Sequence, residues 1–210
     1  MSILNKIAFM LDRRDEVPNQ VVARELAQTQ NAADIREIVD NLGNQEPNVQ
    51  SDCLKVLYEL GYLAPGLISE YVEEFLKLLN HRNNRMVWGG MIALSTIAGL
   101  QAEKIFPHVD KIIKTMEAGS VITNDAGIKT LIAVAARKYE YRLRIMPYLL
   151  ERLANSRAVD APRYAEIMLV AIGPDDQAEF IKIIDKWIKA SSGARLARLQ
   201  KVFKQAGKIA

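Results

Sequence analysis

The sequence contains few of the residues from which metal and catalytic sites are usually built. Of its 210 residues, one is a cysteine, Cys53, and two are histidines, His81 and His108. A single thiol excludes a disulfide framework and a cysteine-rich zinc site, and two histidines exclude a histidine-rich metal centre. The phosphate-binding, dinucleotide-binding, His-Glu-x-x-His and Gly-x-Ser-x-Gly motifs are also missing. We therefore expect no cofactor and no metal, and the sequence favours a non-catalytic protein.

Long apolar runs are missing as well, because none approaches the roughly 18 residues that a membrane span requires. The amino terminus carries Ile3, Leu4, Ile7 and Leu11 at helical spacing, and charged residues rather than a cleavage site follow them. This pattern predicts a short amphipathic helix over 2–11 that covers the end of the core. A membrane-surface anchor is the alternative interpretation. Without a targeting signal, we expect a cytoplasmic protein.

The net charge of +3 is small, but the charge is unevenly distributed. Residues 1–105 hold 10 basic and 14 acidic side chains, whereas residues 106–210 hold 18 and 11. The last helix is predicted to present a basic face formed by Arg195, Arg198, Lys201, Lys204 and Lys208. This face is either the solvated surface of a terminal capping helix or an electrostatic patch for phosphate or an acidic partner.

The chain repeats itself at an offset of 37 residues. Five apolar columns share this register, and each contains residues 37 positions apart: Leu42, Leu79, Met116 and Leu153; Val72, Val109, Met146 and Ile183; Leu76, Ile113, Leu150 and Trp187; Leu57, Leu94, Leu131 and Met168; Leu60, Ile97, Val134 and Ala171. Within a repeat the apolar residues follow a period of 3.6, which indicates amphipathic helices rather than strands. Because a single hairpin cannot bury such a stripe, the repeats must stack on one another.

Each repeat is therefore predicted to be a helical hairpin, and the whole chain an all-α solenoid. The expected helix pairs are 32–42 with 47–60, 66–80 with 84–99, 102–117 with 121–137, 140–154 with 161–172, and 175–190 with 193–206. Residues 1–31 are expected to form amino-terminal capping helices, and residues 32–206 the five hairpins of a single domain over 1–210. Cys53 shares a column with Gly90 and Gly127, which predicts a buried, structural thiol at a close helix contact.

The columns of residues 32–206, above all the segments VQSDCLKVLYELG and MVWGGMIALSTIAG, resemble those of HEAT-repeat proteins in the armadillo-like α-solenoid superfamily. The chain is most similar in kind to the small stand-alone HEAT-repeat proteins of prokaryotes. The resemblance implies a right-handed solenoid whose second helices line a concave groove. The turns depart from the family pattern, because the usual aspartate is replaced by Asn44, His81, Ala118 and Asn155.

The second helices also carry columns that lie outside the apolar stripe. In the first hairpin these positions include Ser51, Asp52, Lys55 and Glu59, which we expect on the concave face. The residues predicted to bind a partner there are Tyr58, Tyr62, Trp88, Ile92, Asp125, Lys129 and Arg163. Trp88, Asp125 and Arg163 are expected side by side on successive helices, where an aromatic ring, a carboxylate and a guanidinium would resemble a recognition site.

Two functions compete for this groove. The favoured interpretation is a protein–protein interaction scaffold that holds an unidentified protein or peptide. The alternative is a nucleic-acid-binding protein related to HEAT-like alkylpurine DNA glycosylases, which place tryptophans and an aspartate in a comparable groove. A groove of mixed charge, with a single tryptophan, is unfavourable for the alternative. A small-ligand site is a third interpretation of the same residues.

Overall fold

The computed structural model describes residues 2–209, and every regular element within that range is a helix. The chain divides into two compact units, residues 1–130 and 131–210, and each unit is described by itself. The prediction of a single domain over 1–210 stays a prediction.

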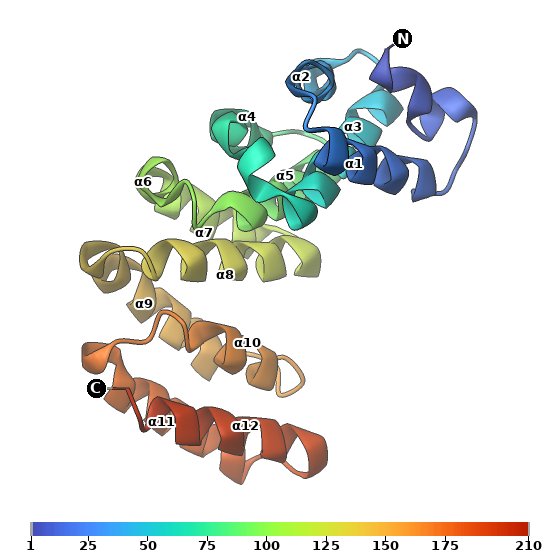
Figure 1. Ribbon diagram of the computed structural model, residues 1–210. Helices are drawn as coiled ribbons and strands as arrows, with labels where there is room; N and C mark the ends of the chain where they lie inside the picture. Colours follow the sequence, from blue (N-terminus) through green and yellow to red (C-terminus); the bar gives the residue numbers. More distant parts are fainter. Residues whose placement is uncertain (1, 210) are drawn as a thin grey trace. The chain divides into compact units, whose positions relative to one another are not determined.

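The first unit is a succession of helical hairpins (Figure 1). Its elements are the 3₁₀ turns η1 (Ile3–Lys6) and η2 (Phe9–Leu11), α1 (Val17–Thr29), α2 (Ala32–Asp40), η3 (Asn41–Gly43), α3 (Pro47–Leu63), η4 (Pro65–Leu67), η5 (Ser69–Tyr71), α4 (Val72–Leu78), α5 (Asn84–Ile97), α6 (Ala102–Ile105), η6 (Phe106–His108), α7 (Val109–Ala118) and α8 (Val121–Ala135), whose last turn belongs to the second unit. Helix α3 packs between α1 and α5, and α4 packs on α5.

The second unit contains two further hairpins. Its helices are α9 (Tyr139–Ala154), α10 (Ala161–Met168), α11 (Pro174–Lys189) and α12 (Gly193–Ala206). Helix α9 packs on α10 and α11, and α12 packs on the same two helices. The expected hairpin pairs are thus found in both units, with boundaries that differ by a few residues.

Polar side chains and prolines determine where several helices begin. The side chain of Asn31 accepts hydrogen bonds from the amides of Ala33 and Asp34, and that of Asn83 accepts one from Arg85. These caps satisfy amides that have no partner inside the helix. Pro47 occupies the first position of α3, where its missing amide hydrogen costs nothing.

Two predicted helices are interrupted. The segment 66–80 was expected to be one helix, but it consists of 3₁₀ turns followed by the short α4. The segment 102–117 is likewise divided into α6, η6 and α7, and Pro107 lies at the division. Proline has no amide hydrogen, and its ring clashes with the preceding turn, so it kinks or breaks a helix. The helix breaks at Pro107, whereas α9 continues through Pro147.

The amino-terminal segment also differs from expectation. Instead of a helix over 2–11, it forms the two 3₁₀ turns η1 and η2. Ile3 and Ile7 are buried, as the spacing predicted, whereas Leu11 is 49% exposed. The segment therefore covers the end of the core with two apolar side chains rather than with a continuous amphipathic stripe.

Nearly all residues of the 37-residue columns lie in the core. Leu57, Leu94, Leu131 and Met168 are all at most 1% exposed, which confirms the central prediction of the repeat. The column of Trp187 is less uniform, because Ile113 and Trp187 itself are only half-buried. The indole N–H of Trp187 donates to the carbonyl of Leu153 at 3.0 Å, so this side chain serves packing.

The small-residue column of Cys53, Gly90 and Gly127 lies at close helix contacts. Cys53 is fully buried. A Cβ atom at Gly90 would approach the Cβ atom of Leu78 to 2.8 Å, and one at Gly127 would overlap the side chain of Met116. Both glycines therefore allow the two helices of a hairpin to approach each other, as the sequence predicted.

Candidate functional site

Three aromatic side chains gather where α3 and α5 pack together. The ring centroids of Tyr58 and Tyr62 are 6.4 Å apart with an interplanar angle of 75°, and those of Tyr58 and Trp88 are 6.2 Å apart at 54°. Such edge-to-face and tilted arrangements are favourable for aromatic pairs. Tyr58 links the other two rings, because it contacts both.

These rings differ in exposure. Tyr58 is 6% exposed and Tyr62 is 57% exposed, while Trp88 is half-buried. Ile92 lies one turn after Trp88 on the same side of α5 and is also half-buried. We call these four residues, Tyr58, Tyr62, Trp88 and Ile92, the aromatic face. Its outer members offer apolar surface to a partner, whereas Tyr58 supports them from below.

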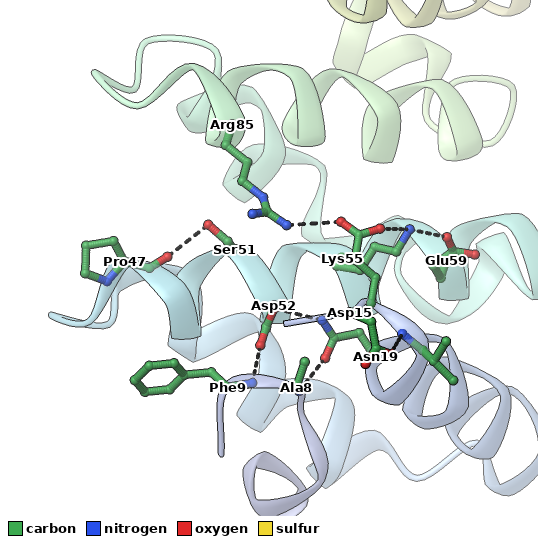
Figure 2. A network of polar contacts seen from close by, with 12 residues as sticks. Ala8, Phe9, Asp15, Asn19, Pro47, Ser51, Asp52, Lys55, Glu59 and Arg85 are labelled. Carbon is green, nitrogen blue, oxygen red and sulfur yellow. Dashed lines mark hydrogen bonds and ion pairs between the residues drawn. The ribbon is translucent and has the colours of Figure 1, made fainter. Parts of the chain in front are cut away.

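A chain of ion pairs runs through Lys55 of α3 (Figure 2). The ammonium of Lys55 is 2.9 Å from a carboxylate oxygen of Glu16 and 2.7 Å from one of Glu59, and Arg85 binds the other oxygen of Glu16 at 3.0 Å. The same ammonium lies 4.8 Å from the centre of the Tyr58 ring. This network joins the residue before α1 to α3 and α5, and it fixes the helices that carry the aromatic face.

The Lys55 cation is stable in this position despite its burial. Burial lowers the pKa of Lys55, but the hydrogen bonds to Glu16 and Glu59 raise it by more, so the pKa lies above its ordinary value. For Tyr58, burial raises the pKa and the nearby Lys55 cation only partly opposes that effect. The ammonium is therefore charged and the phenol neutral at physiological pH.

A second polar cluster holds the amino-terminal segment onto α3 (Figure 2). One carboxylate oxygen of Asp52 accepts from the amide of Phe9 at 2.7 Å, and the other accepts from the side-chain amide of Asn19 at 2.8 Å. The Asn19 carbonyl in turn accepts from the amide of Ala8 at 2.9 Å. Asn19 is fully buried and Asp52 is 9% exposed.

This cluster corrects one expectation. Ser51, Asp52 and Lys55 were expected on an open concave face, but all three are at most 9% exposed. The segment before α3 supplies partners for Asp52 and Lys55, from η2, the start of α1 and Glu16, whereas the hydroxyl of Ser51 donates to the carbonyl of Pro47 within α3. Among the residues of α3 predicted to bind a partner, Tyr62 is exposed and Tyr58 is buried.

The remaining predicted site residues lie on α8 and α10. Asp125 is half-buried and Lys129 exposed, four residues apart on α8. Arg163 belongs to the second unit, where its guanidinium is 3.7 Å from Asp160 and 5.0 Å from the ring centre of Tyr164. The expected alignment of Trp88, Asp125 and Arg163 stays a prediction.

Two exposed apolar residues at the carboxyl ends of α3 and α5 were not among the predicted site residues. Leu63 ends α3 and is 53% exposed, and Leu100 follows α5 and is 59% exposed. They are 37 positions apart, so the repeat register would have paired them. They extend the apolar surface offered at the carboxyl ends of α3 and α5.

The predicted basic residues of the last helix are all at the surface. Arg195, Arg198, Lys201, Lys204 and Lys208 are exposed. Arg198 is engaged by Glu166 of α10 through two hydrogen bonds of 2.8 and 2.6 Å. The other four give α12 and the residues after it a basic surface.

Neither a metal cluster nor a membrane span is found in the described part of the chain. No group of three or more His, Cys, Asp or Glu side chains within residues 2–209 is arranged to hold a metal ion. Within the same range, no helix combines the length and the apolar character needed to cross a bilayer.

Comparison with known proteins identifies the fold. No protein-family model matches the chain, and no curated protein is significantly similar in sequence. Among solved structures, an engineered protein matches with a TM-score of 0.68 and 17% identity, covering 99% of this chain and 97% of that one. A designed armadillo repeat protein matches with a TM-score of 0.67 and 13% identity over 97% and 98% of the two chains.

Part of a third solved structure has the same fold. Kap121p bound to Pho4p matches with a TM-score of 0.69 and 14% identity over 99% of this chain, which corresponds to 23% of the Kap121p chain. The protein is thus an all-α helical-repeat protein with the fold of armadillo and HEAT solenoids.

Proposed function

We propose that this protein is a non-catalytic scaffold that binds an extended segment of a partner protein across the aromatic face. The observation that carries the proposal is the contact of two outer aromatic rings with a buried tyrosine beneath them. Tyr62 is exposed and Trp88 is half-buried, and both contact the buried Tyr58. Rigid aromatic side chains of this kind dominate binding energy in protein interfaces.

The proposal extends within the first unit from α5 to α8. Asp125 and Lys129 would add polar contacts beside the apolar centre, which is the usual composition of an interface rim. Fold relatives support this kind of binding by analogy only. One neighbour is described as a designed armadillo repeat protein for modular peptide recognition, and Kap121p was solved in complexes with Pho4p and Ulp1p.

The test is selection of a displayed random-peptide library on the purified protein. We expect enrichment of peptides that contain aromatic or aliphatic residues, and their affinity should fall by about 2 kcal/mol or more on Trp88→Ala. Tyr139→Ala is the matched control, because Tyr139 is 58% exposed but lies in the second unit on α9. Failure to enrich any peptide, or equal losses for both variants, would contradict the proposal.

A second candidate function rests on the basic surface of α12. Arg195, Lys201, Lys204 and Lys208 are exposed, and residues 181–210 contain eight basic side chains and one acidic one. Such a surface suits the phosphate backbone of a nucleic acid. Titration with a DNA duplex at several salt concentrations tests it, since Lys201→Gln should lower the salt slope by about one phosphate contact. Binding that is absent at low salt would refute this candidate.

A further inference from the structure

A cavity on the first unit collects basic side chains. It has a volume of about 360 Å³ and lies between the turn that joins α4 to α5 and the second half of α7. Four of its lining residues are basic: His81, Arg82, Lys111 and Lys114. Asn80, Asn84 and Thr115 also line it, and none of the described residues that line it is acidic. We call this cavity the turn pocket.

The cationic side chains that line the turn pocket form no ion pairs with carboxylates of the described residues. Several surface cations elsewhere pair closely with carboxylates, as in Lys6 with Glu25 at 2.6 Å or Arg36 with Asp40 at 2.8 Å. Within residues 2–209, no carboxylate lies within ion-pair distance of Arg82, Lys111 or Lys114. Three like charges therefore line one concave site without a counter-charge in contact.

Lys111 lacks a carboxylate partner among the described residues although it is half-buried. Its half-buried ammonium donates a hydrogen bond to the carbonyl of Leu76 at 2.6 Å. Burial lowers the pKa of Lys111, and the more distant charge of Glu73 opposes this only partly. A bound anion would supply the missing counter-charge.

Further donors are available at the same wall. The Nδ1 atom of His81 accepts a hydrogen bond from the amide of Asn83 at 3.0 Å, so the hydrogen of the neutral ring resides on Nε2 as a donor. Helix α5 begins at Asn84, which places the positive end of a 14-residue helix at the pocket. The carboxyl end of α7 at Ala118 opposes that dipole, so anion selectivity depends on the side-chain charges.

We propose that the turn pocket binds the phosphoryl group of a small-molecule ligand. A phosphoryl group carries multiple negative charges and tetrahedrally arranged acceptors, which suit several cationic donors converging from different elements. A monovalent carboxylate would leave two of the three cations without a counter-charge. The volume is within the range of small-ligand sites. This site shares no residue with the aromatic face, so it stands independently of the proposed peptide binding.

Calorimetric titration with inorganic pyrophosphate and with ADP, at constant ionic strength, tests the proposal. Wild-type protein should bind pyrophosphate, and Lys114→Gln should weaken that binding about tenfold or more through loss of a charge-assisted contact. Lys114 is exposed on α7, so this variant should fold normally. Lys111→Gln is the second variant, with circular dichroism confirming its fold. Lys104→Gln is the control, because Lys104 is exposed in the same unit but does not line the pocket.

The relative affinities distinguish a site for the phosphoryl group alone from a nucleotide site. Equal affinities for pyrophosphate and ADP would support a site for the phosphoryl group alone, and tighter ADP binding would support a nucleotide as its source. No binding of either compound by the wild-type protein at millimolar concentration would overturn the proposal. Equal weakening by Lys104→Gln and Lys114→Gln would overturn it as well, because binding would then follow net charge rather than the pocket.

Discussion

The hydrogen bonds of Asp52 lead to a quantitative prediction about the amino-terminal segment. Asp52→Ala removes the acceptor for the amide of Phe9 at 2.7 Å and for the side chain of Asn19 at 2.8 Å. Hydrogen bonds to a charged group contribute about 1.5–3 kcal/mol each. Asn19 is fully buried, so its amide cannot turn to water. We therefore expect the variant to lose about 3–5 kcal/mol of unfolding free energy.

Urea denaturation followed by circular dichroism measures this loss, and amide hydrogen exchange locates it. The amides of Phe9 and Ala8 should lose protection in Asp52→Ala, because both belong to the same cluster. Asp40→Ala is the matched control, since Asp40 forms an exposed pair with Arg36 that is worth at most about 0.5 kcal/mol. If both variants lost equal stability and the two amides kept their protection, the reasoning would be refuted.

Three further predictions concern the core, the aromatic face and a surface pair. Cys53, whose pKa burial raises to about 12, should react with a thiol reagent only after unfolding, and rapid labelling of the native protein would contradict its structural role. Leu94→Ala should cost about 2–5 kcal/mol in urea denaturation, and Trp88→Ala should cost less, because Leu94 is fully buried and Trp88 is not. The hydrogen bond from Arg198 holds the pKa of Glu166 below its ordinary 4.5, so this ion pair stabilises the protein above that pH and its contribution is lost as the pH falls. Because both side chains are exposed, we expect the contribution to be at most about 0.5 kcal/mol. Glu166→Gln should remove this pH dependence of the unfolding free energy.

The hairpins and their core could be predicted because the sequence carries a sustained period. Leu57, Leu94, Leu131 and Met168 are 37 positions apart and all are buried, since each repeat must hide the same stripe against its neighbours. Helix interruptions were harder to predict. Pro107 was visible in the sequence, but its effect depended on whether the helix would bend or break there.

The burial of Asp52 and Lys55 could not be predicted from the repeat register. Both occupy columns that face outward in an isolated hairpin, and they are buried because a non-repeating segment, residues 8–19, supplies partners that no periodicity encodes. The spacing of Lys55 and Glu59 did permit an ion pair within α3, but nothing in it indicated Glu16. The same limit applies to Arg163, whose position relative to Trp88 depends on how successive repeats stack.

The aromatic face was partly predictable. Tyr58, Tyr62 and Trp88 were selected as residues outside the apolar stripe, and their rings do contact one another in sequence order. The sequence did not reveal that Tyr58 would be buried beneath the other two, because that depends on how closely α3 and α5 approach. Gly89 on α5 allows this approach, since a Cβ atom there would meet the side chain of Leu54 at 2.5 Å.

Tryptophan fluorescence tests the central claim most directly, because the chain has only two tryptophans, Trp88 and Trp187. In the Trp187→Phe variant, all tryptophan emission comes from the aromatic face. Titration of this variant with a library-selected peptide should shift the emission to shorter wavelength as Trp88 leaves water. The Trp88→Phe variant, which keeps only the half-buried Trp187, should show no shift with the same peptide. A peptide that binds tightly yet leaves the Trp88 emission unchanged would contradict binding across the aromatic face.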